Sequence, residues 1–197
     1  MRVIGSVPSD AVVREFLRDH PYDPDERDNT NDDAESNLHA ADRLLGHWYR
    51  VLLDRSELLE VILPWHLGEG GGIELVPPTG LTLADASAAL RALGDTYALS
   101  NPHCAHKLNW QATAPLGPIH LSTRAVPGAD YERMEPREGL IHLDGLHRML
   151  AWENAGRLHG GVRIEALVAA DASWPTTLNA GQDSGRNTAG RIHGEAR

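Results

Sequence analysis

The stretch GLIHLDGLHRMLAWENAG, residues 139–156, decides the fold that we expect for this chain. It opens with LIHLD at residues 140–144, an apolar run ending on an acid, which is typical of a buried strand. Gly145 follows, and glycine permits backbone conformations in tight turns that other residues avoid. A helix is expected over residues 146–158. The segment therefore predicts a strand, a turn and a helix in immediate succession.

The start of this predicted helix has the features of an anion-binding site. The first amide hydrogens of a helix lack partners within the helix, and they carry the positive end of its dipole. Arg148 adds a planar cation suited to phosphate, His147 adds a donor that titrates near neutrality, and Asp144 precedes the turn. We therefore expect a nucleotide phosphate to bind at Gly145, Leu146, His147 and Arg148. A simpler interpretation stays open, in which Asp144 caps the helix and Arg148 pairs with a surface acid.

The rest of the chain divides into regions by composition. Residues 1–33 are expected to form an N-terminal extension with an acidic linker, residues 34–72 a helical region packed on the core, residues 73–170 the α+β core, and residues 171–197 a loosely ordered tail. Apolar periodicity, with Ser9 and Thr82 as expected helix caps, predicts helices over residues 9–19, 34–52, 56–63 and 82–93, and strands over residues 73–76, 119–123 and 162–168. Residues 95–116 carry no regular pattern and are expected to be irregular, and GEGGG at 68–72 is expected to be a loop or hinge.

Charge and composition restrict the classes of function. The chain has 18 basic and 28 acidic residues and a formal charge of −10, which disfavours nucleic acid as a partner. Its one cysteine cannot form an intrachain disulfide, which fits a reducing compartment. No signal-peptide pattern and no apolar run of membrane-spanning length occurs in the sequence. We therefore expect a cytoplasmic protein that does not bind membranes; the sequence does not indicate the oligomeric state.

Several histidines could act as ligands of a metal ion. The run NPHCAH places His103, Cys104 and His106 within four residues, and His120 and His142 lie on strands that are expected to be neighbours. Structural zinc sites usually bring a second paired set of ligands, and the sequence contains neither CxxC nor HExxH. We therefore expect no metal site, with zinc at His103 and His106 as the alternative.

The order of these elements resembles a known superfamily. IELV, LTLADASAALRALG, PIHLST, GLIHLD, the helix opened by GLHR and VRIEALV follow one another as in the ParB/sulfiredoxin-like superfamily, over residues 73–169, about half of the chain. DGLHR is most similar to the DGHHR turn of the free-serine kinases of that superfamily. The resemblance implies a small mixed sheet with helices, in the α+β class. It also implies that the turn holds the phosphates of ATP, ADP or CTP, with Mg²⁺ as a further cofactor.

The resemblance carries expectations about activity. It implies an enzyme, a nucleotide-dependent kinase or nucleotide hydrolase acting on a small hydroxylated metabolite or amino acid, with Asp144 and His147 as catalytic residues. Asp144 would act on the substrate hydroxyl or organise Mg²⁺. The kinases also carry a glutamate after their first strand, where this chain reads PPTG at 77–80, so that Glu74 or Asp85 would have to replace it.

Other members of the superfamily fit less well. Leu146 stands where sulfiredoxin has its reactive cysteine, so sulfiredoxin chemistry is not expected. The partition proteins have a helix-turn-helix domain after this fold, and the acidic charge also opposes DNA binding. Two alternatives to a kinase remain: a regulatory module that binds a nucleotide or metabolite without chemistry, and a nuclease-like DNA-processing protein.

Overall fold

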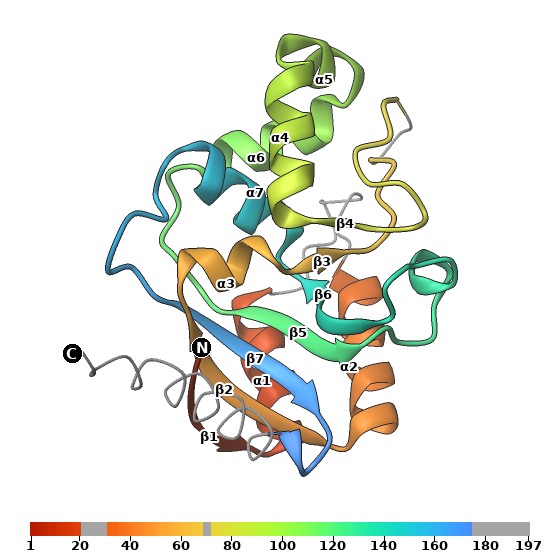
Figure 1. The fold of residues 1–197 in the computed structure, drawn as a ribbon, viewed down its shortest axis with the longest axis vertical. Coiled ribbons are helices and arrows are strands. Elements are labelled where there is room, and N and C mark those ends of the chain that lie inside the picture. Colours follow the sequence, from red (N-terminus) through yellow and green to blue (C-terminus); the bar gives the residue numbers. More distant parts are fainter. Residues whose placement is uncertain (21–30, 69–71, 175–197) are drawn as a thin grey trace, which may run out of the picture.

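A mixed seven-stranded sheet forms the centre of the protein (Figure 1). The structure is a computed structural model, and it describes residues 1–20, 31–68 and 72–174. The strands lie in the order β1-β2-β7-β5-β6-β3-β4. Their bounds are β1 Arg2–Val7, β2 His47–Leu53, β3 Ile62–Leu63, β4 Leu81–Thr82, β5 Ile119–Arg124, β6 Glu138–Asp144 and β7 Ile164–Ala170. β6 pairs antiparallel with β5 and parallel with β3, so the strand that precedes the DGLHR turn lies inside the sheet.

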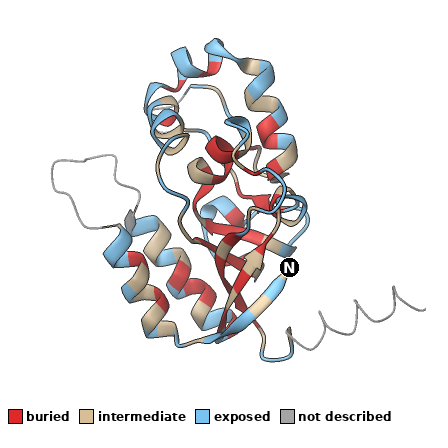
Figure 2. Cartoon of the chain, turned by 90° about the vertical axis from the view of Figure 1, so that its left-hand side faces the viewer, coloured by how far each residue is buried: buried red, intermediate tan, exposed pale blue. Residues whose placement is uncertain are grey.

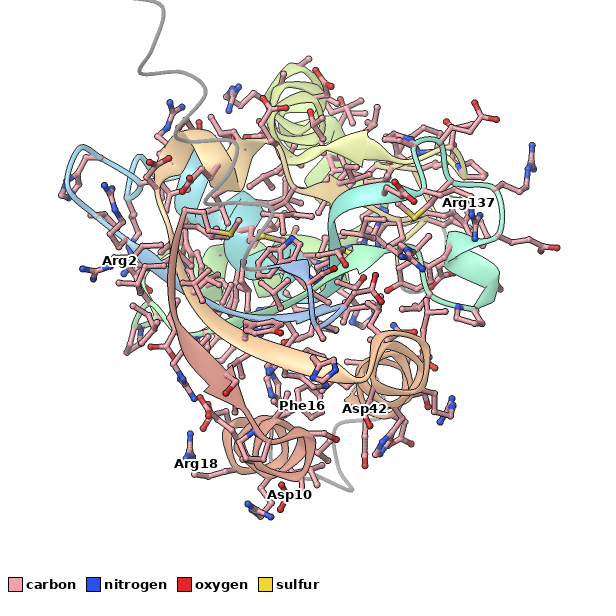
Figure 3. All side chains as sticks on the ribbon, turned by 60° about the horizontal axis from the view of Figure 1, so that its bottom comes forward. Arg2, Asp10, Phe16, Arg18, Asp42 and Arg137 are labelled. Atoms are coloured by element: carbon pink, nitrogen blue, oxygen red, sulfur yellow. The ribbon has the colours of Figure 1, made fainter. Side chains whose placement is uncertain are left out.

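Helices cover both faces of the sheet. The helices are α1 Ser9–Asp19, α2 Asn31–Leu45, α3 Arg55–Leu59, α4 Leu83–Leu93, α5 Asp95–Ser100, α6 Pro102–Gln111, the 3-10 turn η1 Ala129–Tyr131 and α7 Leu146–Asn154. α1 and α2 lie on one face, with Phe16 directed at the sheet and Asp10 and Arg18 directed away from it (Figure 3). α4, α6 and α7 lie together on the other face.

The side chains of the central strands alternate between two hydrophobic clusters. In β5, Ile119 and Leu121 face the cluster under α4, α6 and α7, and in β6 Ile141 and Leu143 face the cluster under α1 and α2. Buried residues concentrate along the sheet and on the inner sides of the helices (Figure 2). Because both faces are covered, two polar residues of β5, His120 and Ser122, are buried. Among the described helices, none has the length and apolar character needed to span a bilayer.

The α+β class is confirmed, as are several elements. α1 and α4 match the predicted helices closely, with Thr82 accepting a hydrogen bond from the Asp85 amide at the start of α4 and Gly94 ending it. The predicted capping role of Ser9 is wrong, because Pro8 is the N-cap of α1 and no side chain caps it. The strand, turn and helix around Gly145 are confirmed as β6 and α7, although α7 ends at Asn154, earlier than expected.

The long helix predicted over residues 34–52 is wrong in its second half. α2 ends at Leu45, Gly46 adopts a positive φ of 74°, and β2 begins at His47. Residues 47–53 read HWYRVLL, where bulky and aromatic side chains suit a strand that pairs with neighbours on both sides, β1 and β7. Trp48 lies in the core of the protein, with 2% of its surface exposed.

Other boundaries also differ. Residues 95–116 are largely helical rather than irregular, because α5 and α6 occupy most of them. The predicted strand at 73–76 contributes only a single bridge, between His66 and Val76. The helix predicted over residues 56–63 ends at Leu59 and is followed by β3, and β1 lies in a segment where no strand was predicted. The sheet therefore includes strands from before residue 73, where the α+β core was predicted to begin, as well as strands after it. Most of the acidic linker, the centre of GEGGG and most of the tail lie outside the described residues.

Candidate functional site

Gly145 forms the turn between β6 and α7. Its φ of 106° and ψ of 17° place it in the left-handed region, which favours glycine. A Cβ atom at this position would lie 2.8 Å from Cγ2 of Ile119, the first residue of the adjacent strand β5. The glycine therefore allows β6 to end and α7 to begin directly against β5.

Gly145→Ala is expected to lower the free energy of unfolding by about 1–3 kcal/mol, the usual cost of holding a non-glycine residue in a strained backbone region. The close approach to Ile119 adds to this cost. Urea denaturation followed by circular dichroism measures the change. Gly160→Ala is the control, because a Cβ atom there meets nothing within 4 Å. Equal stability of the two variants would contradict the described turn.

A buried network of charges lies at this turn. Asp144, at the end of β6, forms an ion pair with Arg148 in the first turn of α7, and their side chains are only 14% and 12% exposed. The Arg148 guanidinium also donates from Nη1 to the Pro118 carbonyl oxygen at 2.8 Å. His120 Nδ1 lies 3.2 Å from Asp144 Oδ2, and His20 Nε2 lies 4.0 Å from the same oxygen. Asp144 thus connects β5, β6, α7 and the end of α1.

This network keeps Asp144 ionised. Burial alone would raise the pKa of Asp144, but the charge of Arg148 and the hydrogen bond with His120 outweigh burial and hold the pKa below its usual range. The simpler interpretation of the sequence is therefore not what the structure shows: Arg148 pairs with Asp144 rather than with a surface acid, and no side chain caps α7.

The remaining turn residues point to different surroundings. Leu146 is 7% exposed and packs in the cluster under α4, α6 and α7. His147 stacks edge-on against His66 with ring centroids 5.2 Å apart, and its Nε2 has no hydrogen-bond partner among the described residues. The side chains of the turn therefore have three different environments. Asp144 and Arg148 pair with each other, Leu146 lies in the core, and His147 faces the loop that follows β3.

His142 is a further buried histidine close to the turn. It lies on β6 two residues before Asp144, and both of its ring nitrogens lack hydrogen-bond partners within the described part of the chain. Burial lowers the pKa of His142 to about 4, and the negative charge of Asp144 offsets burial only in part. The hydroxyl of Tyr131 donates to the His142 carbonyl oxygen at 3.0 Å, which fixes the backbone here. His142 and His120 do lie on neighbouring strands, as predicted.

A second cluster joins His147 to His66 and Cys104. The potential ligand atoms of the three residues all lie within 4.8 Å of one another, and Cys104 Sγ lies 3.6 Å from His66 Nε2. His103 and His106, which the sequence suggested as partners of Cys104, are exposed on α6 while Cys104 is fully buried. Cys104 therefore does not share a binding site with His103 or His106, because successive residues of a helix face different directions. Zinc at His103 and His106 without Cys104 stays a prediction.

Both histidines of this cluster are neutral at pH 7. Burial, together with the positive charge of Lys107, lowers the pKa of His66 to about 4. Burial lowers the pKa of His147 to about 3, with smaller contributions from the charges of His66 and Lys107. Neutral imidazole is the form of histidine that binds metal ions.

Asn101, between α5 and α6, holds the loop that carries His66. Its side-chain amide donates to the carbonyl oxygens of Leu67 and Ile73 at 3.1 and 3.0 Å, and its Oδ1 accepts from the Ile73 amide at 2.9 Å. A Cβ atom on Gly68 would lie 3.3 Å from Cys104 Sγ and would collide with Asn101. The glycine therefore allows the loop to approach Cys104 closely.

The acids proposed to replace the kinase glutamate are engaged by other groups. Trp65 Nε1 donates to the Glu74 carboxylate at 2.7 Å, and the Thr82 hydroxyl donates to the Asp85 carboxylate at 2.8 Å.

The sequence pattern indicated Cys104 as a possible metal ligand but did not indicate that His66 and His147 would be its partners. The one local feature of the sequence that indicated a close contact near His66 was the glycine-rich run after it, because glycine permits backbones to approach closely.

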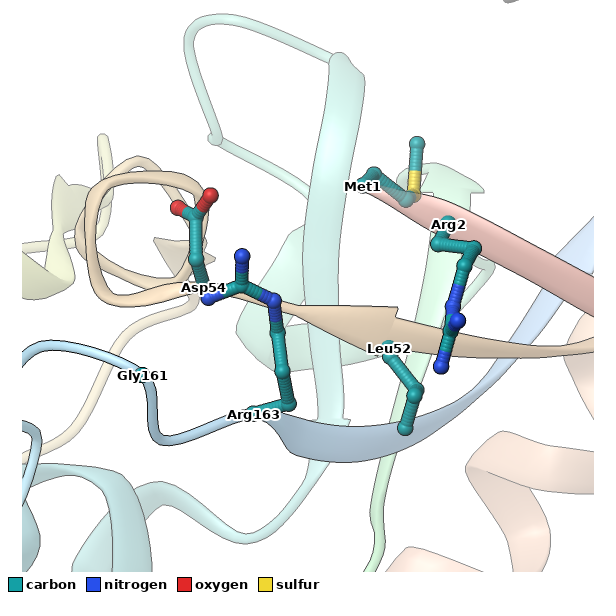
Figure 4. A pocket seen from close by; sticks show the side chains of 6 residues that line it. All are labelled: Met1, Arg2, Leu52, Asp54, Gly161 and Arg163. Carbon is teal, nitrogen blue, oxygen red and sulfur yellow. The ribbon is translucent and has the colours of Figure 1, made fainter.

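A surface hollow of about 360 Å³ lies elsewhere in the protein. Arg2, Leu52, Asp54 and Arg163 are among the residues that line it, and Arg163 reaches toward Asp54 (Figure 4). Neither Asp144 nor the Cys104 cluster borders this hollow. The concentration of buried ionisable groups, rather than this hollow, therefore marks the candidate site.

The comparisons with known proteins add a family but no activity. No curated protein and no solved structure gives a significant match to the chain. A family model covers residues 1–187 of the 197, and thus both the Asp144 network and the Cys104 cluster. The chain belongs to this family, which is described as a family of unknown function (DUF6309).

Proposed function

We propose that this protein is a cytoplasmic nucleotide-binding protein of the ParB/sulfiredoxin-like kind, which holds the phosphates of ATP, ADP or CTP at the turn from Asp144 to Arg148. The observation that carries the proposal is the buried network at that turn, in which Asp144 holds Arg148 and His120 together at the start of α7. Helix amides, a left-handed glycine and an arginine are the groups that cradle phosphates in proteins.

Unpartnered polar groups beside the network support a ligand here. His120 is 2% exposed and His142 is 9% exposed, yet His120 Nε2 and both ring nitrogens of His142 lack hydrogen-bond partners among the described residues. A buried polar atom without a partner costs about 1–3 kcal/mol. A phosphate or a substrate hydroxyl that reaches these nitrogens would remove that cost. The guanidinium of Arg148 has five N–H donors, so its bonds to Asp144 and Pro118 leave others for a phosphate.

The proposed activity is transfer of a phosphoryl group to a small hydroxylated metabolite or amino acid, or hydrolysis of the nucleotide. The low pKa makes Asp144 a weak base but a suitable oxygen ligand, so its role in this proposal is to hold Mg²⁺ that arrives with the nucleotide. Magnesium supplies charge neutralisation on the phosphates. His120, oriented through Nδ1 by Asp144, has Nε2 to accept the proton of the acceptor hydroxyl.

A regulatory module that binds a nucleotide or metabolite without chemistry is the second candidate. The observation that favours it is the engagement of Glu74 with Trp65 and of Asp85 with Thr82. Both carboxylates are thus bound to other side chains of the described residues rather than directed at Asp144 to complete a kinase site. Turnover separates the two candidates, because both predict nucleotide binding.

Arg148→Lys is expected to weaken nucleotide binding by roughly 1.5–3 kcal/mol, the value of a hydrogen bond to a charged group. Lysine keeps the positive charge beside Asp144, so the fold is disturbed less than by an apolar residue, but it lacks the fork that binds phosphate in two places. Isothermal titration calorimetry with ATP, ADP and CTP, with and without Mg²⁺, measures the affinities.

Arg157→Lys is the matched control for this binding experiment. Arg157 also donates to backbone carbonyl oxygens, but it lies beyond the other end of α7. Unchanged affinity in Arg148→Lys would remove Arg148 from the site. Absence of saturable binding of all three nucleotides to the unmodified protein would overturn the proposed function. If binding occurs but no phosphate transfer or hydrolysis is detected over a panel of hydroxylated amino acids and metabolites, the regulatory module is the correct candidate.

A further inference from the structure

We propose that His66, Cys104 and His147 form a binding site for a transition-metal ion of the zinc class, with one coordination position left for water or a ligand. The site uses the side chain of His147, which lies within the proposed phosphate-binding turn, but metal binding requires no nucleotide. Three separate segments supply the ligands: the loop after β3, helix α6 and the first turn of α7.

The spacing of the ligand atoms fits a tetrahedral ion. With Zn–S near 2.3 Å and Zn–N near 2.0–2.1 Å, a tetrahedral angle separates sulfur and nitrogen by about 3.6 Å. Cys104 Sγ and His66 Nε2 lie 3.6 Å apart. The third ligand atom, from His147, lies within 4.8 Å of both, a separation that a small side-chain rotation reduces to the tetrahedral value. His147 Nε2 has no partner among the described residues and is thus available to bind.

The surrounding structure fixes two of the ligands from outside. The backbone of His66 pairs with Val76 through hydrogen bonds of 3.0 and 3.2 Å, and Asn101 holds the residues that follow His66. Cys104 is fully buried, and it packs in the same hydrophobic cluster as Tyr97. Metal ligands are characteristically oriented by such outer contacts.

The donor set selects the class of ion. One thiolate and two imidazoles suit zinc, cobalt and related ions, whereas Mg²⁺ requires oxygen ligands. Three protein ligands with a fourth position open is the arrangement of zinc sites that bind water or substrate. The positive charge of Lys107 opposes a cation, but binding releases the thiol proton of Cys104 to solvent and leaves a negative thiolate.

A structural alternative explains the same cluster without a metal. The thiol of Cys104 could donate a hydrogen bond to His66 Nε2, with His147 as a packing neighbour. That alternative leaves the buried His147 Nε2 without a partner, and it predicts no saturable metal binding. The two interpretations therefore differ in a directly measurable quantity.

The test is a metal titration of the full chain, first treated with EDTA and then dialysed, in the absence of nucleotide. Co²⁺ is expected to bind with one equivalent and to give the thiolate-to-cobalt charge-transfer band and the strong visible bands of a tetrahedral site. Zn²⁺ is expected to displace Co²⁺ and to raise the melting temperature with the logarithm of its concentration once that concentration exceeds Kd. Cys104→Ser is expected to lose the charge-transfer band and to weaken binding at least tenfold.

His106→Ala is the matched control, because His106 is exposed on the same helix and should retain the wild-type spectrum and affinity. The cobalt spectrum of the unmodified protein tests the site even if Cys104→Ser fails to fold. The proposal is overturned if the unmodified protein binds less than half an equivalent of either ion, or if bound cobalt shows no thiolate band. Because no nucleotide is present, failure here leaves the proposed function standing, and failure of nucleotide binding leaves this site standing.

Discussion

Arg148→Leu is expected to lower the free energy of unfolding by about 3–5 kcal/mol, because it leaves one member of a buried ion pair without its partner. Asp144 is 14% exposed and would lose the largest favourable charge that acts on it. The pKa of Asp144 would then rise, since burial would no longer be offset by the guanidinium. Leu also removes the hydrogen bond to the Pro118 carbonyl oxygen, which ties α7 to the start of β5.

The measurement is urea denaturation at pH 7, compared with Arg14→Leu. Arg14 pairs with Asp10, and both side chains are 68% exposed, so this pair contributes little to stability. The double variant Asp144→Leu/Arg148→Leu should recover part of the loss, because no unpaired charge stays buried. A loss below about 1 kcal/mol in Arg148→Leu would show that the pair is solvated in solution, contrary to the described burial.

The strand, turn and helix around Gly145 could be predicted because their signals are local. An apolar run, a glycine that adopts φ of 106° and an arginine four residues after an acid all lie within residues 140–148. The pairing of Asp144 with Arg148 follows the ordinary i, i+4 spacing of the first turn. Helix α4 was predictable for the same reason, because Thr82 and Gly94 mark its two ends.

The error over residues 34–52 shows where local signals fail. Apolar residues at spacings of three and four continue from Leu38 through Trp48 to Leu52, as in one amphipathic helix. Pairing of residues 47–53 with β1 and β7 supplies hydrogen bonds on both sides, and this tertiary preference outweighs helical periodicity. In the sequence, only Gly46 indicated that the helix ends there, and in the structure it adopts a positive φ between α2 and β2.

The Cys104 cluster could not be predicted from the sequence because its members are distant. His66 and Cys104 are 38 residues apart, and His147 lies on a third element. These residues come together only because residues 102–111 form helix α6, which the sequence pattern did not predict. The helix directs Cys104 into the core and the histidines next to it toward solvent. Sequence proximity therefore suggested His103 and His106, whereas packing selected His66 and His147.

Acidification from pH 7 to pH 5 is expected to destabilise the protein by about 2 kcal/mol through His142 alone. Burial lowers its pKa from the ordinary 6.5 to about 4, so the unfolded chain binds this proton more readily than the folded chain. The stability linked to His142 is therefore fully present above pH 6.5 and is lost as the pH falls toward 4. His66 and His147 have lowered pKa values as well and act in the same direction.

Denaturation midpoints at intervals between pH 7.5 and pH 4.5, with EDTA present to exclude metal release, test this dependence. Asp144 contributes in a lower window, because its pKa is already below the ordinary 3.8 and its stabilisation is lost only as the pH falls below that value. His142→Leu, of similar volume and without a titrating group, should remove about 2 kcal/mol of the loss between pH 7 and pH 5. His106→Leu should retain the whole dependence, because His106 is exposed. An identical pH dependence in the two variants would mean that water reaches His142. The candidate site would then lack the buried, unpartnered histidine that supports it.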